Sequence, residues 1–232
     1  MKVLLLSSSM VHGRGYLDHA EEPIRAFFAG IGRVLFVPFA LHDRVAYAAK
    51  ARDRFRALGF ELDSLHDAPD ARRAVETAEA FFVGGGNTFR LLKALYDTGV
   101  LEPMRARVAA GAPYLGSSAG SNVAGPTIKT TKDMPIVQPP SFDALGIVGF
   151  QISPHFLDPD PASTHMGETQ EERIVQFHEE CATPVAGLRE GTHVLARGGS
   201  IRLGGSAGAR IFRRGRPPVE ATPGSDLREL LA

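Results

Sequence analysis

One pentapeptide has the spacing of a catalytic serine turn. Gly116-Ser117-Ser118-Ala119-Gly120 matches the pattern G-x-S-x-G, and it follows the strand-like run APYLG and precedes a helix-like segment. Small neighbours let the backbone turn sharply, so that the serine oxygen is lifted out of the sheet. The helix start that follows supplies N–H groups and positive dipole near developing negative charge. The pattern predicts Ser118 as a nucleophile, with an ordinary glycine-rich turn as the alternative.

A second glycine-rich segment, Gly84-Gly85-Gly86-Asn87, also follows an apolar run. Because glycine has no side chain, the backbone N–H groups of such a loop can approach a ligand closely. The loop is suited to cradle a phosphate or to complete an oxyanion hole, and a plain strand-to-helix turn is the alternative. It lacks the G-x-G-x-x-G spacing of a dinucleotide site, so we expect no nucleotide cofactor.

A serine nucleophile needs a base, and histidine is the usual one. Four of the eight histidines fall in or beside amphipathic segments, where a packed or solvated role is expected. His155 differs because it ends the apolar run FQISPHF and would emerge at the same edge of the sheet as Ser118. We therefore take His155 as the candidate base, against a strand-end histidine with a structural role.

Sequence spacing alone does not identify the other residues of the site. The carboxylate that would orient the histidine is one of four: Asp133, Asp143, Asp158 or Glu168. No H-x-x-x-H or clustered Cys/His spacing occurs in the sequence, so we expect no metal site.

The elements that must position these residues alternate between strand and helix. Strands are predicted at 2–7, 33–38, 59–65, 78–83 and 112–116, and helices at 16–29, 43–58, 69–77, 88–98 and 102–110. Asp43 suits the start of the clearest helix and Gly59 its end. The alternation predicts an α/β fold with a doubly wound, mostly parallel sheet. Ligands bind at the carboxyl ends of such strands, where GGGN and SSAG both lie.

The pattern changes after residue 185, where four short strands follow: VAGLRE, THVLAR, SIRLGG and ARIFRR. We expect them to finish the sheet or to extend it as short antiparallel strands. The proline-rich segment 135–142 (PIVQPPSF) is expected to be a loop long enough to cover a site. With no linker, repeat or low-complexity tract, residues 1–232 are expected to form one catalytic domain.

Composition narrows the class of partner. Basic and acidic residues number 26 each, and this balance argues against a nucleic-acid or membrane-surface footprint. The single cysteine, Cys181, excludes an intrachain disulfide and fits a reducing cytoplasm. The apolar run at the N-terminus is too short for a secretion signal or a bilayer span and is interpreted as the first strand. A basic run is interpreted as a solvated edge strand and turn: Arg210, Arg213, Arg214 and Arg216.

Longer stretches of the chain resemble the peptidase E, or aspartyl dipeptidase, family of serine peptidases. The matching segments include LLLSSS, FVGGGNTFRLLKAL, GSSAGSN, PTIKTTKDMPIV, FDALGI, QISPHF and the GET at 167–169. PTIKTTKDMPIV is long and unusual, which makes the resemblance specific. The implied fold resembles that of the class I glutamine amidotransferases, which carry a cysteine where this chain has Ser118.

The resemblance implies a role for each matching residue. Ser118 matches the nucleophile and His155 the base. Asp133 in KDMP matches the orienting acid, with Glu168 as the alternative, unless Glu168 only pairs with Arg173 or with N–H groups at a helix start. Gly86 and Ala119 match the oxyanion-hole amides. We expect three residues to contact substrate: Asn87, Gln170 and Arg173.

One position departs from the family pattern. Members often read GETR, and that arginine is associated with binding the aspartyl carboxylate of the substrate, whereas this chain reads GETQ, with Gln170. Arginine holds a carboxylate through two charge-assisted bonds, which glutamine cannot make. Losing a charged contact of about 1.5–3 kcal/mol relaxes selectivity tenfold or more, unless another cation compensates. The candidates are Arg173, Lys132, Lys129 and Arg14.

The resemblance therefore implies a serine dipeptidase that needs no cofactor. It would act through an acyl-enzyme on short peptides with a free amino end and aspartate first. A broader-specificity or cyanophycinase-like serine peptidase is the nearest alternative. A non-catalytic domain of the same fold that binds a small anion is the alternative of a different class. The resemblance also suggests a cytoplasmic homodimer or higher homo-oligomer.

Overall fold

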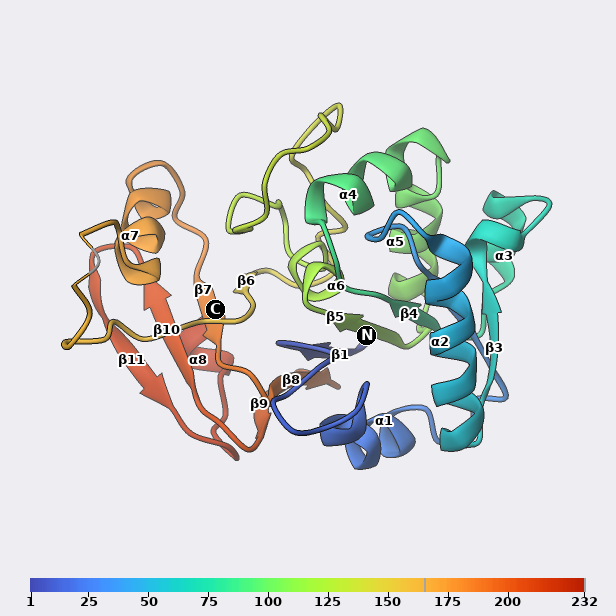
Figure 1. The fold of residues 1–232 in the computed structure, drawn as a ribbon, viewed down its shortest axis with the longest axis horizontal. Helices are drawn as coiled ribbons and strands as arrows, with labels where there is room; N and C mark the ends of the chain where they lie inside the picture. The colour runs from blue at the N-terminus through green and yellow to red at the C-terminus, as the bar shows by residue number, and fades with distance from the viewer. Residues whose placement is uncertain (165, 232) are drawn as a thin grey trace.

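Two β-sheets organise the chain in the computed structural model, which describes residues 1–164 and 166–231 (Figure 1). The larger sheet has seven strands in the order β3-β2-β4-β5-β1-β8-β9. Its first five strands run parallel, and β8 and β9 continue it in antiparallel fashion. The expected α/β class with a mostly parallel sheet is therefore confirmed. Its strands are β1 (Lys2–Leu6), β2 (Arg33–Val37), β3 (Glu61–Ser64), β4 (Phe81–Val83), β5 (Tyr114–Ser117), β8 (Thr192–Arg197) and β9 (Ser200–Gly205).

Alternating side chains of the strands fill two separate cores. In β1, Val3 and Leu5 face one core, whereas Leu4 and Leu6 face the other. The first core is closed by α3 (Ala71–Thr77), α4 (Thr88–Asp97) and α5 (Leu101–Ala109), and the second by α1 (Glu21–Phe27) and α2 (Arg44–Leu58). Figure 1 shows α4 and α5 on the opposite side of the sheet from α1. This two-sided cover is why the strands are apolar on both faces.

The helices largely follow the sequence pattern. Asp43 accepts a hydrogen bond from the N–H of Ala46 and caps α2, and Gly59 ends it with a φ of 87°. The helix predicted at 16–29 is shorter, because a 3-10 turn, η1 (Asp18–Ala20), comes first and α1 begins at Glu21. Pro23 lies in the first turn of α1, where its missing N–H has no helical partner.

The C-terminal strands divide between the two sheets. β8 and β9 extend the main sheet, whereas β7 (Val185–Leu188) and β10 (Ala209–Arg213) join β6 (Gln151–Ser153) and β11 (Arg216–Ala221) in a four-stranded sheet ordered β11-β10-β7-β6. This smaller sheet packs against α7 (Gln170–Glu180) through Phe156, Ile174 and Phe212. It lies with α7 at one end of the molecule, at the left in Figure 1. The remaining elements are η2 (Leu65–Asp67), α6 (Ala119–Asn122) and α8 (Arg228–Leu231).

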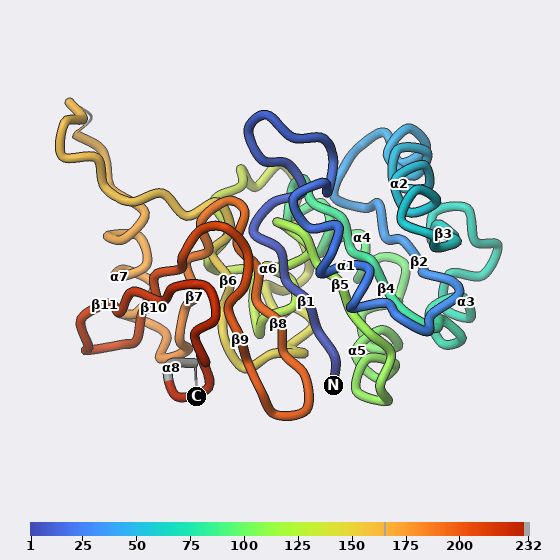
Figure 2. Tube along the Cα trace, turned by 90° about the horizontal axis from the view of Figure 1, so that it is seen from below, coloured from blue at the N-terminus to red at the C-terminus, as the bar shows by residue number. Residues whose placement is uncertain are grey.

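Two irregular segments reach away from the sheets. The proline-rich stretch 135–142 contains neither helix nor strand, as expected. Residues 157–164, which follow β6, project from the body at the upper left of the tube in Figure 2. Within residues 1–164 and 166–231, no helix has the length and apolar character needed to cross a membrane.

Candidate active site

Ser118 occupies a strained turn between β5 and α6. Its backbone has φ 52° and ψ −111°, a conformation that costs a non-glycine residue free energy. The turn is held because the Ser118 N–H donates to the carbonyl of Leu6 at 3.1 Å. The two glycines of the motif are required by close packing. A Cβ on Gly116 would lie 2.5 Å from the Gly120 carbonyl oxygen, and a Cβ on Gly120 would overlap the Val83 carbonyl.

His155 lies beside Ser118, and its Nε2 is 2.9 Å from the Ser118 Oγ. The residue follows β6 and also has a left-handed backbone, with φ 52°. Its N–H donates to the Oγ of Ser7 at 2.9 Å, and that hydroxyl donates to the Leu188 carbonyl at 2.8 Å. The ends of β1 and β7 thereby fix the histidine at the edge where the elbow emerges. The structure thus brings together the two residues that the sequence paired.

The carboxylate on the other ring nitrogen of His155 belongs to Glu190. Its Oε1 lies 2.9 Å from the His155 Nδ1, and both side chains are partly exposed. Glu190 was not among the four carboxylates considered from the sequence. The signal for it lies in the second sheet, where β6 and β7 run parallel with Ser153 opposite Gly187. Residues shortly after the two strands therefore meet, and VAGLRE ends with this glutamate.

Asp133, the expected orienting acid, is engaged elsewhere. Its Oδ2 accepts hydrogen bonds from the Thr88 N–H at 2.7 Å, the Thr88 Oγ1 at 2.6 Å and the Thr131 Oγ1 at 3.2 Å. A carboxylate is stabilised at a helix N-terminus, where N–H groups are free and the dipole is positive. Asp133 therefore holds its loop against the first residue of α4 instead of orienting His155.

Glu168, the alternative orienter, is paired with residues of α7. Its Oε1 accepts from the Gln176 Nε2 at 2.7 Å, and its Oε2 is 3.7 Å from the Arg173 Nε. Glu168 thus pairs with Arg173 near the start of α7, which was the structural alternative to a role in orienting His155. Thr169 and Glu172 complete this helix start with a capping box.

The glycine loop abuts the serine turn. A Cβ on Gly85 would lie 3.0 Å from the Ser118 Cβ, and one on Gly86 would lie 2.7 Å from the Ala40 carbonyl oxygen. Gly86 has a φ of 134°, which glycine alone adopts readily. Ala119 is buried at the first position of α6, directly after Ser118. The two residues expected to supply oxyanion amides thus lie in the loop beside the nucleophile and next to it in the chain.

Asn87 has a structural role that the sequence did not predict. Its Oδ1 accepts from the Arg90 N–H at 3.0 Å and caps α4, while its Nδ2 donates to the Met134 carbonyl at 2.9 Å. These bonds fasten the loop after Asp133 to the glycine loop. The expectation that the Asn87 amide contacts substrate stays a prediction, and the bonds within the protein already use one donor and one acceptor site of the amide.

Gln170 is bound by a lysine. Its Oε1 accepts from the Lys132 Nζ and from the Leu157 N–H, each at 3.0 Å. The same ammonium donates to the carbonyls of Pro154 at 2.6 Å and His155 at 2.8 Å. Lys132 as a residue is exposed, but its ammonium is bonded to these three oxygens. Desolvation of that group, with a smaller effect of Arg173, lowers the pKa of Lys132 to about 8.

The cations near Gln170 converge on a small cavity of about 70 Å³. Lys129, Lys132 and Arg173 line it together with Gln170. Of the four cations considered as substitutes for the missing arginine, Lys132 contacts Gln170, and Lys129 and Arg173 share its cavity. Arg14 lies on a different loop, between β1 and η1.

Comparison with known proteins gives consistent matches. The family model described as peptidase family S51 matches residues 3–212. A protein named peptidase E from Streptomyces coelicolor is 52% identical over 231 residues, which cover 100% of this chain and 95% of the relative. A probable alpha-aspartyl dipeptidase from Drosophila melanogaster is 48% identical over 232 residues, covering 99% and 97%.

Solved structures support the fold. A putative peptidase E from Listeria monocytogenes superposes with a TM-score of 0.67 at 21% identity and covers 89% of this chain and 98% of its own. A peptidase from an acI-B1 actinobacterium superposes with a TM-score of 0.72 at 18% identity, covering 97% and 95%. At identities this low, the superpositions are evidence for the fold and not for the function.

Proposed function

The chain belongs to peptidase family S51, and from that premise we propose that it is a serine dipeptidase that releases an N-terminal aspartate from short peptides. Ser118 is the nucleophile, His155 the general base and Glu190 the carboxylate that orients the histidine. The observation that carries the proposal is one continuous hydrogen-bonded line. It runs from Ser118 Oγ to His155 Nε2 at 2.9 Å, and from His155 Nδ1 to Glu190 Oε1 at 2.9 Å.

The chemistry proceeds in two balanced steps. His155 takes the proton of Ser118 while Oγ bonds to the peptide carbonyl carbon; the C–N bond then breaks, and the same proton passes to the departing amine. A water molecule next gives a proton to His155 and its oxygen bonds to the acyl carbon; the bond from that carbon to Ser118 Oγ then breaks, and His155 returns the proton to Oγ as the aspartate leaves. The N–H groups of Gly86 and Ala119 stabilise the oxyanion in both steps.

The selection of aspartate is assigned to the small cationic cavity. Its volume of about 70 Å³ suits a short acidic group, and Lys129, Lys132 and Arg173 supply positive charge. Lys132 touches both Gln170 and the His155 carbonyl, so its charge lies where the family's arginine is missing. The names of the two full-length relatives support the same choice of substrate, since one is a peptidase E and the other a probable alpha-aspartyl dipeptidase.

Two experiments on the purified protein test the proposal. A fluorophosphonate probe should modify one residue, and peptide mapping by mass spectrometry should identify it as Ser118. A panel of Asp-Leu, Glu-Leu, Asn-Leu and Gly-Leu should then show the highest kcat/KM for Asp-Leu. Absence of labelling together with absence of hydrolysis would favour a binding domain, and equal rates across the panel would favour the broader-specificity peptidase. Cleavage of aspartyl-linked polymers in preference to Asp-Leu would favour the cyanophycinase-like alternative.

Further properties follow from the family resemblance and remain part of the proposal. We propose a homodimer or higher homo-oligomer, in the cytoplasm, in which residues 1–232 form one catalytic domain without nucleic-acid or membrane partners. Light scattering coupled to size-exclusion chromatography tests the assembly, and a mass equal to one chain would contradict it.

A further inference from the structure

A large cavity opens beside the glycine loop, and apart from Gly86 its lining residues take no part in the proposed chemistry. It measures about 680 Å³ and is lined by Gly85 and Gly86 on one side. Since a Cβ on Gly85 would lie 3.0 Å from the Ser118 Cβ, the cavity begins next to the nucleophile. The small cationic cavity lies at Lys132 and Gln170, on the histidine side of the site. The catalytic pair thus has two neighbouring hollows of very different size.

One of the cations that line the large cavity is available to bind an anionic ligand. Arg90 lines it from α4, three residues after the helix cap Asn87. Within residues 1–164 and 166–231, the Arg90 guanidinium has no carboxylate within ion-pair distance and no hydrogen bond. Lys50 lies across the cavity with its ammonium 4.7 Å from the centre of the Tyr16 ring. One carboxylate also lines the cavity, and this residue, Asp43, already caps α2.

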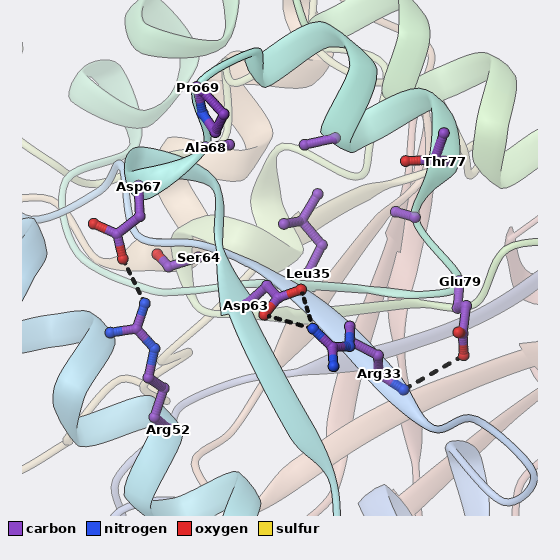
Figure 3. Close-up of a pocket in the computed structure, with 12 residues that line it drawn as sticks. Arg33, Leu35, Arg52, Asp63, Ser64, Asp67, Ala68, Pro69, Thr77 and Glu79 are labelled. Atoms are coloured by element: carbon purple, nitrogen blue, oxygen red, sulfur yellow. Dashed lines mark hydrogen bonds and ion pairs between the residues drawn. The ribbon is translucent and has the colours of Figure 1, made fainter.

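A cavity elsewhere in the molecule provides a contrast (Figure 3). It measures about 400 Å³ and lies at β3, three strands from β5 in the sheet. Its arginines are already paired, Arg33 with Asp63 at 3.0 Å and Arg52 with Asp67. Glu79 there accepts from the N–H of Gly32 at 3.2 Å. Charges that neutralise one another offer little to an ionic ligand, so the unpaired Arg90 distinguishes the cavity beside Ser118.

The walls of the large cavity combine this charge with apolar surface. Met10 and Leu41 are exposed large hydrophobic residues, and both line it. Tyr16 and Tyr47 form part of the wall and are largely buried. An amino acid with a large apolar side chain and a free carboxylate matches this combination.

Resting on the proposed function, we propose that the large cavity binds the residue released by the reaction. Its apolar side chain packs against Met10 and Leu41, and its C-terminal carboxylate pairs with Arg90. This assignment gives a physical reason for dipeptide cleavage, because only a peptide that ends one residue beyond the scissile bond places its carboxylate at Arg90. Longer peptides present a neutral amide there and forgo a charge-assisted contact.

A matched pair of substrates tests the inference. Asp-Leu and Asp-Leu-amide have the same scissile bond and differ at the carboxylate. The unaltered enzyme should have a KM for Asp-Leu about tenfold or more below that for the amide. In Arg90→Gln the KM for Asp-Leu should rise to that for the amide, so that the distinction is lost. Free leucine should inhibit the unaltered enzyme competitively. Inhibition of the Arg90→Gln variant should require a higher concentration of leucine.

The control is Arg73→Gln, which removes the same charge from an exposed position on α3. It should keep the full distinction between the two substrates. Two results would overturn the inference and leave the proposed function standing. One is an equal KM for both substrates in the unaltered enzyme, and the other is an equal rise of both KM values in Arg90→Gln. Failure of the unaltered enzyme to cleave either substrate would overturn both. Thermal unfolding midpoints identify a variant that has simply lost its fold.

Discussion

Glu190 Oε1 lies 2.9 Å from His155 Nδ1, although the two residues are 35 positions apart in the chain. The parallel pairing of β6 with β7 brings them together, because each residue follows the end of its strand. A carboxylate on Nδ1 fixes the tautomer in which Nε2 accepts the serine proton, and it stabilises the imidazolium that forms. For this reason the proposal gives the orienting role to Glu190, in place of Asp133 or Glu168.

Glu190→Gln should therefore reduce kcat for Asp-Leu by about 10²- to 10³-fold, because the amide can stabilise the wrong tautomer and carries no charge. The expected reduction in kcat is smaller than the largest known for such substitutions because Glu190 is partly exposed. Steady-state kinetics measures the change. Asp133→Asn is the matched control, since it also replaces a carboxylate by an amide, and it should lower kcat far less. A larger loss in Asp133→Asn would return the orienting role to Asp133.

Gly86→Ala should lower kcat through the backbone. The new methyl group would lie 2.7 Å from the Ala40 carbonyl oxygen at a φ of 134°, so the loop must shift and take the Gly86 N–H with it. Loss of one oxyanion donor costs about 10²- to 10³-fold in kcat. Gly99→Ala provides the control for backbone strain, because Gly99 also has a positive φ, 65°, with nothing within 4 Å of the added methyl. Comparable losses in both variants would contradict the role of Gly86.

Lys132 should impose an alkaline limit on activity. Its pKa is lowered to about 8, so the ammonium is fully formed at lower pH and disappears as the pH rises through that value. The charged group has three N–H donors for its three oxygen partners, whereas the neutral amine has two and brings no charge to the cavity. The kcat/KM for Asp-Leu should thus fall above about pH 8. Lys132→Met should be less active at pH 7 and lack this decline; an unchanged alkaline limb would assign it to another group.

Arginine at position 170 should not restore a stricter preference for aspartate. The Gln170 Oε1 accepts bonds from Lys132 and Leu157, and arginine has no acceptor to replace it. Gln170→Arg would also bring two like charges together, so kcat/KM for Asp-Leu should fall about tenfold. Adding Lys132→Gln to Gln170→Arg, which leaves one cation and one amide at the two positions, should recover most of the loss. A single Gln170→Arg variant more selective for Asp-Leu over Gly-Leu than the original would refute this account.

The sequence was informative where one local pattern carries the chemistry. The serine turn and the glycine loop each need small residues at fixed spacing, and Ser118 and Gly86 could be predicted as site candidates for that reason. His155 was accessible because an apolar strand leads directly to it. The alternation of strands and helices likewise predicted the parallel part of the main sheet.

Glu190 was missed because its place depends on pairing between strands, which local spacing does not reveal. The four C-terminal segments read alike as short strands, yet VAGL joins β6 in a second sheet and THVLAR joins β1. Asp133 attracted attention through its motif, but the motif is explained by a different task, since Asp133 fixes the loop to α4. Asn87 likewise has a structural role that was not predicted, because its spacing suits a helix cap as well as a substrate contact.

The most direct test of the account is the turnover of Asp-Leu by Ser118→Ala, compared with the unaltered enzyme under the same conditions. Removal of the Oγ eliminates the acyl-enzyme, so kcat should fall by about 10⁴-fold or more while the thermal unfolding midpoint stays close to that of the parent. A folded Ser118→Ala variant that retains Asp-Leu turnover within tenfold of the parent would contradict the central claim.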